Sequence, residues 1–116
     1  MRRALAMLVI LCAATGARAQ SCIDTAPLDT FGDCFQAEIL PLEAKVVHLV
    51  NAVRSRYRAD PERLRAFDRS ADAWNAERNS RCSAEAQGKA PIEAKRAFAS
   101  CTKRALEARA RELEAL

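Results

Sequence analysis

Trp74-Asn75-Ala76-Glu77-Arg78-Asn79-Ser80-Arg81-Cys82 is the most distinctive stretch of this 116-residue chain. Trp74, Arg78 and Cys82 follow one another at intervals of four residues. On an α-helix, this spacing places the three side chains on adjacent turns of roughly one face. We expect Trp74 to fill the core, the stem of Arg78 to cover its ring with the charged head in water, and Cys82 to lock the helix end.

The helix that carries this stretch has clear boundary signals. Asp60-Pro61 is an acidic N-cap followed by the one helical position that tolerates proline, and Gly88 is a natural C-terminal stop. One stripe of the expected helix is formed by Leu64, Phe67, Ala71, Trp74 and Arg78.

A last long helix is predicted after Pro91, because its residues are strong helix formers. Its marked positions are Ile92, Phe98, Thr102, Leu106, Ala110 and Leu113. Together with the preceding helix it would form an antiparallel hairpin at the C-terminal end of the chain.

The first half of the chain also follows a helical pattern. Residues 20–32 are expected to be an irregular lead-in, and a short helix from Asp33 to Leu40 is expected to break or kink at Pro41. Beyond Pro41, apolar residues recur every three or four positions up to Tyr57. The predicted fold is therefore all-α, a small bundle of three to four helices stapled by disulfides.

Four cysteines remain once Cys12 is removed with a signal peptide: Cys22, Cys34, Cys82 and Cys101. They allow three pairings, of which we favour Cys22–Cys34 and Cys82–Cys101, because each joins neighbours along the chain. Cys82 lies ~9 Å of helix before Gly88 and Cys101 ~15 Å after Pro91, so this bridge is feasible but not forced. The alternative, a metal site, is disfavoured because the chain has no CxxC spacing and a single distant histidine.

The amino end has the three parts of a secretory signal. Arg2 and Arg3 precede an apolar run, residues 4–14, which is followed by the small residues Ala17 and Ala19. We predict cleavage after Ala19, leaving a domain of residues 20–116 in the periplasm or secreted. The alternatives are an uncleaved anchor and a lipoprotein attached at Cys22, but Gln20 is a poor residue before a lipidated cysteine.

Charge in the predicted mature chain is nearly balanced. The precursor has 19 basic and 15 acidic side chains, and Arg2, Arg3 and Arg18 leave with the signal, so the mature net charge is 16 − 15 = +1. Acids and bases alternate along the segments, as on solvated helix faces. We therefore expect no nucleic-acid partner. Nothing in the mature chain resembles a transmembrane segment, so we also expect no membrane association after cleavage.

Catalytic residues are not evident in the sequence. The one histidine, His48, lies on what we interpret as the apolar side of its helix, as a packed or rim residue. Glu112 and Glu114 belong to an amphipathic tail, and no nucleophile elbow or phosphate-binding glycine loop occurs. We predict a binding protein without a cofactor or metal rather than an enzyme.

The cysteine and tryptophan framework resembles the lysozyme-inhibitor LprI-like family, a bacterial cell-envelope domain. The matching positions are Cys22, Cys34, Trp74, Arg78, Cys82, Cys101, Arg109 and Leu113. The chain departs from the family pattern at Asn79 in place of Asp and at Ala71 in place of Gln. It also keeps only Val50-Asn51, with Arg54 at the end, of a Leu-Asn-x-x-Tyr motif in the preceding helix.

This resemblance implies a periplasmic or secreted protein that inhibits lysozyme, and the physical route would be occlusion of the sugar-binding cleft. The candidate partner contacts are Arg78 and Arg81, or the turn from Gln87 to Ala90. The alternative is a structural or adaptor module that binds another envelope protein through an exposed helix face. A small-ligand carrier is a third alternative, but few apolar side chains remain outside the expected core to line a ligand pocket.

We predict that the exported protein has the mass of residues 20–116 with its four cysteines joined in two disulfides. Intact-mass spectrometry before and after reduction, together with a thiol titration, measures both properties. Four free sulfhydryls or a bound metal ion in the processed protein would contradict this prediction.

Overall fold

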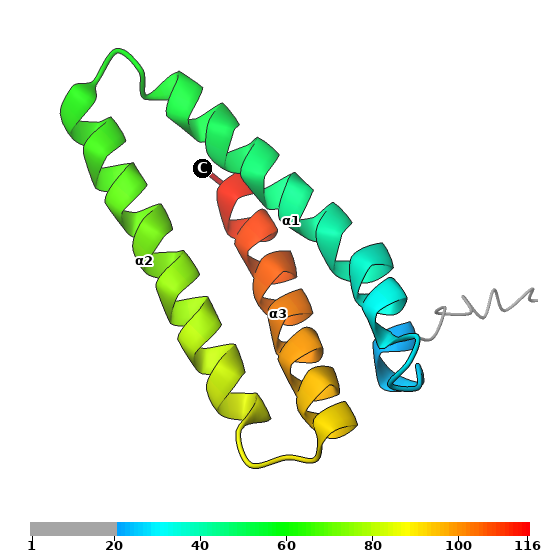
Figure 1. Cartoon of the computed structure of the whole chain (residues 1–116). Coiled ribbons are helices and arrows are strands. Elements are labelled where there is room, and N and C mark those ends of the chain that lie inside the picture. Colours follow the sequence, from blue (N-terminus) through cyan, green and yellow to red (C-terminus); the bar gives the residue numbers. More distant parts are fainter. Residues whose placement is uncertain (1–20) are drawn as a thin grey trace, which may run out of the picture.

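A computed structural model describes residues 21–116, so the predicted signal peptide and Cys12 lie outside the described residues. The elements are a 3-10 helix η1 (Cys22–Asp24) and three α-helices, α1 (Phe31–Arg56), α2 (Pro61–Ala86) and α3 (Pro91–Glu114). Figure 1 shows their order along the chain, without any strand in this part of it. The all-α bundle is confirmed. Within residues 21–116, none of the helices combines the length and hydropathy required of a membrane span.

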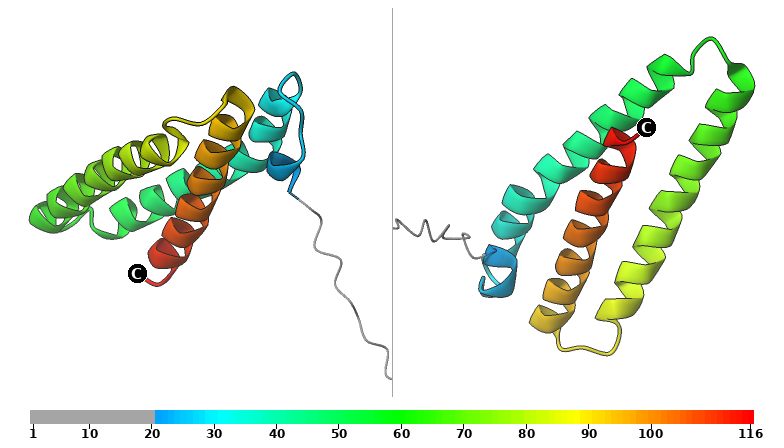
Figure 2. Two further views of the ribbon diagram at one scale, coloured as in Figure 1. Left: turned by 90° about the horizontal axis from the view of Figure 1, so that it is seen from below. Right: turned by 180° about the vertical axis from the view of Figure 1, so that it is seen from behind.

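The helix α3 occupies the central place in the bundle. It packs extensively against both α1 and α2, whereas α1 and α2 have few contacts with each other. In Figures 1 and 2, α3 lies between the other two helices, and α1 and α2 extend past its C-terminus to their connecting turn. The residues that α3 buries are Ala99, Cys101, Thr102, Ala105, Leu106, Ala110 and Leu113.

The helix α1 corrects the prediction of a break at Pro41, because it runs through this residue without interruption from Phe31 to Arg56. A proline ring inside a helix removes the hydrogen bond to the carbonyl four residues earlier, here that of Ala37. Both Pro41 and Ala37 are exposed, so water can satisfy this carbonyl. Burial of Ile39 and Val46 on either side offsets the remaining cost.

The helix α2 begins and ends where the sequence predicts. The Asp60 side chain accepts a hydrogen bond from the Arg63 backbone N–H at 3.2 Å, and Pro61 occupies the first helical position. After Ala86, Gly88 adopts a φ of 77°, which favours glycine. The predicted stripe faces inward as well: Phe67 is buried, and Leu64, Ala71, Trp74 and Arg78 are partly buried.

Both favoured disulfides are confirmed. Cys22–Cys34 joins η1 to α1 with a Cα–Cα distance of 5.8 Å, and Cys82–Cys101 joins α2 to α3 with 5.4 Å. Each bridge closes a short loop, which is typically worth about 3 kcal/mol because it restricts the unfolded chain.

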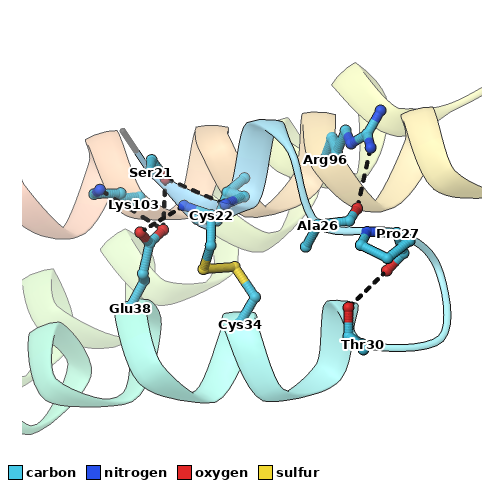
Figure 3. Close-up of a disulfide and its surroundings, with 10 residues drawn as sticks. Ser21, Cys22, Ala26, Pro27, Thr30, Cys34, Glu38, Arg96 and Lys103 are labelled. Carbon is cyan, nitrogen blue, oxygen red and sulfur yellow. Dashed lines mark hydrogen bonds and ion pairs between the residues drawn. A yellow bond between two sulfur atoms is a disulfide. The ribbon is translucent and has the colours of Figure 1, made fainter. Parts of the chain in front are cut away.

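The lead-in segment is held against both α1 and α3. Ile23 is buried in the core, next to the disulfide. A guanidinium nitrogen of Arg96, on α3, donates a hydrogen bond to the backbone carbonyl of Ala26 at 3.0 Å, and Figure 3 shows this contact together with the bridge. The chain between η1 and α1 is therefore fixed by covalent, apolar and polar contacts together.

We expect Leu106→Ala to destabilise the bundle by about 2–5 kcal/mol, because Leu106 is 1% exposed at the centre of α3 and its truncation leaves a cavity. Leu40→Ala is the matched control, since Leu40 is 49% exposed on α1. Urea unfolding followed by circular dichroism measures both variants. Equal losses would contradict the central role of α3.

Candidate partner-binding surface

Trp74 is the centre of a cluster that joins all three helices. The guanidinium of Arg78, one turn further along α2, lies 5.3 Å from the ring centroid of Trp74. The guanidinium of Arg109, on α3, lies 5.5 Å from the same centroid. Two cation–π contacts therefore hold one indole, and two of the family-matching positions meet on it.

The side chain of Arg78 makes its contacts inside the bundle. Its side chain is 14% exposed, and its Nη1 lies 3.6 Å from a carboxylate oxygen of Glu43 on α1. Its Nε and Nη2 donate to the Asn79 side-chain oxygen at 3.3 and 3.1 Å. The sequence-based expectation that the Arg78 guanidinium lies in water is therefore wrong. The pairing with Glu43 could not be predicted from the α2 sequence, because Glu43 belongs to a different helix. Arg78 has little freedom to contact a partner.

Arg109 and Leu113 also pack inside the bundle. The side chain of Arg109 is 13% exposed and pairs with Glu112 at 3.4 Å, and Leu113 is buried. Of the acidic pair in the C-terminal tail, Glu112 thus holds Arg109, while Glu114 pairs with Lys45 of α1 at 2.9 Å. These carboxylates stabilise helix contacts instead of converging on a cleft.

Arg81 differs from Arg78 because it is exposed on α2. It borders two neighbouring hollows between α2 and α3, with volumes of about 310 and 330 Å³. The first hollow is lined by Trp74, Glu77, Arg78, Arg81, Ala105, Ala108 and Glu112. The second includes Cys101, so Arg81 stands directly beside the disulfide that fixes this end of the bundle.

The turn from Gln87 to Ala90 projects from the same end of the molecule. All four of its residues are exposed. Pro91 begins α3 immediately after it, and the Cys82–Cys101 bridge lies just behind it. The turn is thus a short, convex and covalently supported feature (Figure 1).

A larger cleft of about 420 Å³ lies between α1 and α2. Its lining residues are Val46, Val47, Val50, Asn51, Arg54, Asp68, Ala71, Asp72 and Asn75. Val47 is 58% exposed, which is unusual for a large apolar side chain on this bundle. Three departures from the family pattern, Val50, Arg54 and Ala71, line this cleft, and composition alone did not reveal it.

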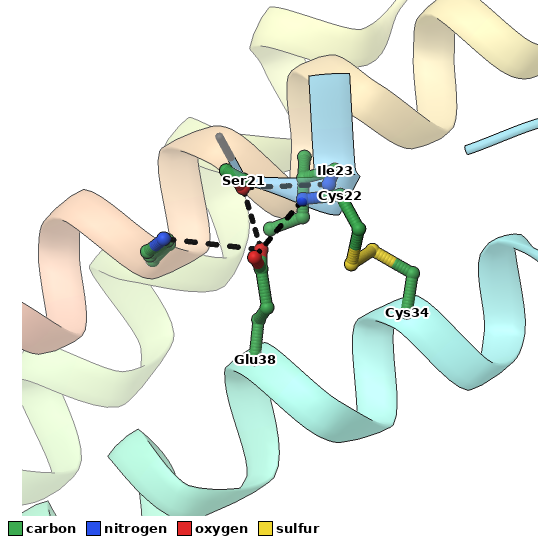
Figure 4. Close-up of polar contacts among 6 residues, drawn as sticks. Ser21, Cys22, Ile23, Cys34 and Glu38 are labelled. Atoms are coloured by element: carbon green, nitrogen blue, oxygen red, sulfur yellow. Dashed lines mark hydrogen bonds and ion pairs between the residues drawn. A yellow bond between two sulfur atoms is a disulfide. The ribbon is translucent and has the colours of Figure 1, made fainter. Parts of the chain in front are cut away.

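The amino-terminal bridge is surrounded by a polar cluster, drawn in Figure 4. Glu38 accepts hydrogen bonds from the Ser21 hydroxyl at 2.6 Å and from the Cys22 backbone N–H at 3.1 Å, and Lys103 lies 3.8 Å from it. The Glu38 carboxylate and the two sulfurs of Cys22 and Cys34 lie within 4.8 Å of one another, a spacing that suits a metal ion. However, the sulfurs are joined in a disulfide, so the cluster acts as a latch for η1.

His48 does not lie on the apolar side of its helix, and that expectation is wrong. It is exposed, whereas the inward face of α1 runs through Val46 and Val53. The error arises because apolar residues surround His48 in the sequence on both sides, and Val47 next to it is exposed as well.

Comparison with known families gives one match. A family model described as Lysozyme inhibitor LprI matches residues 16–113, which is most of the chain. The comparisons with curated proteins and with solved structures returned no match.

We expect Arg78→Ala to lower the stability of the bundle by about 1–2 kcal/mol, because it removes a cation–π contact, buried stem packing and the ion pair to α1. It should also change the fluorescence of Trp74, the only tryptophan of the chain. Arg81→Ala is the control on the same helix and should leave both properties unchanged. Thermal unfolding and emission spectra test the pair, and an unaltered Arg78→Ala variant would disprove the internal role.

Proposed function

The chain belongs to the lysozyme inhibitor LprI family, and from this premise we propose that it is an exported protein that inhibits a lysozyme by occupying its substrate cleft. The proposed contact surface, called here the α2–α3 end, consists of Arg81 and the turn of residues 87–90. The family is one of inhibitors and not of enzymes. The two disulfides agree with an oxidising, extracytoplasmic location, which we propose to be the periplasm or the exterior.

The chemistry of the target favours an arginine on a convex feature. Lysozymes cleave glycosidic bonds with a pair of carboxyl groups at the bottom of a groove. A guanidinium group presents a fork of N–H donors that matches a carboxylate. The 87–90 turn is a narrow projection that can enter a groove that a flat helix face would only cover, and Arg81, on α2 behind this turn, would meet carboxylates at the edge of the groove.

The exposure of Arg81 beside a fixed disulfide is the observation that carries the proposal. Arg78, the other arginine of the motif, is engaged by Glu43, Asn79 and Trp74. Arg81 makes no ion pair with any residue that the structure describes. Its side chain is therefore available to a partner without loss of an internal contact.

The rigidity of the α2–α3 end adds to the expected affinity. Binding costs free energy when loops and side chains become ordered, and a preorganised surface reduces this cost. The Cys82–Cys101 bridge holds the backbone next to Arg81 in place, and the fixed φ of Pro91 restricts the end of the turn. Reduction of this bridge should consequently weaken inhibition even where the helices persist.

The cleft between α1 and α2 supports a second candidate function, an adaptor that binds another envelope protein. Its exposed Val47 and its mixed polar rim suit a segment of a protein partner. This surface is separate from the α2–α3 end. Substitutions in one surface therefore distinguish the two functions.

We expect purified residues 20–116 to slow the lysis of bacterial cells by lysozyme, and Arg81→Ala to raise the concentration needed by about tenfold or more, as for a central interface arginine. A turbidity assay across several lysozyme classes measures this. Arg69→Ala, an exposed arginine of α2 near its other end, is the matched control and should inhibit like the parent.

Unchanged lysis at a large molar excess over every lysozyme class would eliminate inhibition and leave the adaptor function. Inhibition that survives Arg81→Ala together with Lys89→Ala, but is lost with Val47→Asp, would move the contact to the cleft between α1 and α2.

A further inference from the structure

The end of the molecule opposite the α2–α3 end carries an excess of positive charge. We call residues 50–70 the α1–α2 end; Figures 1 and 2 show it at the far pole of the bundle from the 87–90 turn and η1. It contains six arginines and three acids, a balance of 6 − 3 = +3, whereas the rest of residues 20–116 has 10 − 12 = −2. The arginines are Arg54, Arg56, Arg58, Arg63, Arg65 and Arg69.

Two of the three acids in this region are occupied by the fold. Asp60 caps α2 through the Arg63 backbone N–H, and Asp68 accepts two hydrogen bonds from Arg54 at 2.8 and 3.3 Å. The third, Glu62, lies in the first turn of α2, where a negative charge favours the helix dipole. The acids thus stabilise helix geometry and do not pair with the outer arginines.

Five of the six arginines of the α1–α2 end have no ion-pair partner among residues 21–116, and three of these five also make no side-chain hydrogen bond or cation–π contact there. These three are Arg58, Arg65 and Arg69, and all are exposed. By contrast, Arg56 donates to the backbone carbonyl of Leu116 at 3.1 Å, and the Arg63 guanidinium lies 4.3 Å from the centroid of the Tyr57 ring. The unpaired charge is therefore gathered on the outer surface of this end.

A hollow of about 310 Å³ lies within this surface, between α1 and α2. It is lined by Asn51, Arg54, Ser55, Arg58 and Leu64, so every polar residue of the lining can donate hydrogen bonds and none is acidic. Asp68 holds Arg54 through Nε and Nη2, which leaves Nη1 without a partner in the described chain. The hollow thus combines two guanidinium groups with an amide and a hydroxyl.

We propose that this hollow binds the phosphate group of an anionic lipid headgroup and docks the α1–α2 end on a membrane surface. Guanidinium forks match phosphate oxygens in geometry and charge, and the amide and hydroxyl complete the set of donors. Arg65 and Arg69 are exposed on α2 outside the lining of the hollow and would meet neighbouring headgroups. This differs from the sequence-based expectation of no membrane association, which was drawn from the lack of a transmembrane segment in the mature chain.

A flat surface fits this charge distribution better than a soluble polyanion does. A nucleic acid or acidic polymer that followed the length of the bundle would meet its net negative remainder. A membrane touched only by the pole would meet the positive end alone. Docked in this way, the α2–α3 end points away from the membrane.

The test is co-sedimentation of residues 20–116 with phosphatidylcholine vesicles, with and without phosphatidylglycerol. We expect binding only to the vesicles that contain phosphatidylglycerol, and weakening by salt. The triple variant Arg58→Gln, Arg65→Gln, Arg69→Gln should lower binding about a hundredfold, since each arginine near an anionic surface contributes about fivefold. The control Lys95→Gln, Arg104→Gln, Arg111→Gln changes the net charge equally on exposed sites of α3 and should bind like the parent.

A second variant distinguishes specific binding of a phosphate group in the hollow from non-specific electrostatic attraction to the membrane. Arg58→Lys keeps the charge but loses the fork, and we expect it to bind several-fold more weakly. Failure to bind phosphatidylglycerol vesicles, equal losses in the two triple variants, or full binding by Arg58→Lys would each overturn the proposal. So would retention on single-stranded DNA without vesicle binding. No lysozyme is present, so the result is independent of the inhibition assay.

Discussion

The burial of α3 against two helices at once is the interaction on which the rest of this molecule depends. α2 buries only Phe67 and Cys82, and it has few contacts with α1. α3 instead presents a stripe of small and aliphatic residues that both neighbours share, with Leu106 at its centre. Because α1 and α2 extend beyond the end of α3 (Figure 1), the part of the bundle next to their connecting turn depends on local contacts such as the edge-to-face pair of Tyr57 and Phe67, whose ring centroids lie 5.9 Å apart.

The two disulfides add stability that the small hydrophobic core does not provide by itself. A chain of this size buries a modest share of its surface, so its free energy of unfolding is small without crosslinks. One bridge attaches the lead-in segment to α1, where Glu38 and Lys103 add a polar latch, and the other joins α2 to α3 close to their turn. The same covalent support that stabilises the fold restrains the backbone of the proposed contact surface at the α2–α3 end.

The arginines of this chain divide into two groups by their surroundings. Arg78 and Arg109 make cation–π contacts with Trp74 inside the bundle. By contrast, Arg81 and the exposed arginines of the α1–α2 end face the solvent. These exposed groups lie toward opposite poles of an elongated bundle. Such a molecule can present one end to a protein and the other to an anionic surface, because neither contact covers the residues used by the other.

The all-α class, the limits of α2 and its inward stripe were determined by the sequence itself, because caps and helical periodicity act between neighbours along the chain. The sequence favoured the observed pairing of the cysteines without forcing it. The tertiary structure alone decided that the helix passes through Pro41, that Glu43 draws the head of Arg78 inside, and that His48 faces outward. The tertiary structure also decided which charges stay unpaired. Asp68 on α2 pairs with Arg54 on α1, whereas Arg58 is left exposed without an ion pair among the described residues. In each case the deciding contact or exposure depends on packing between different helices, which no local pattern records.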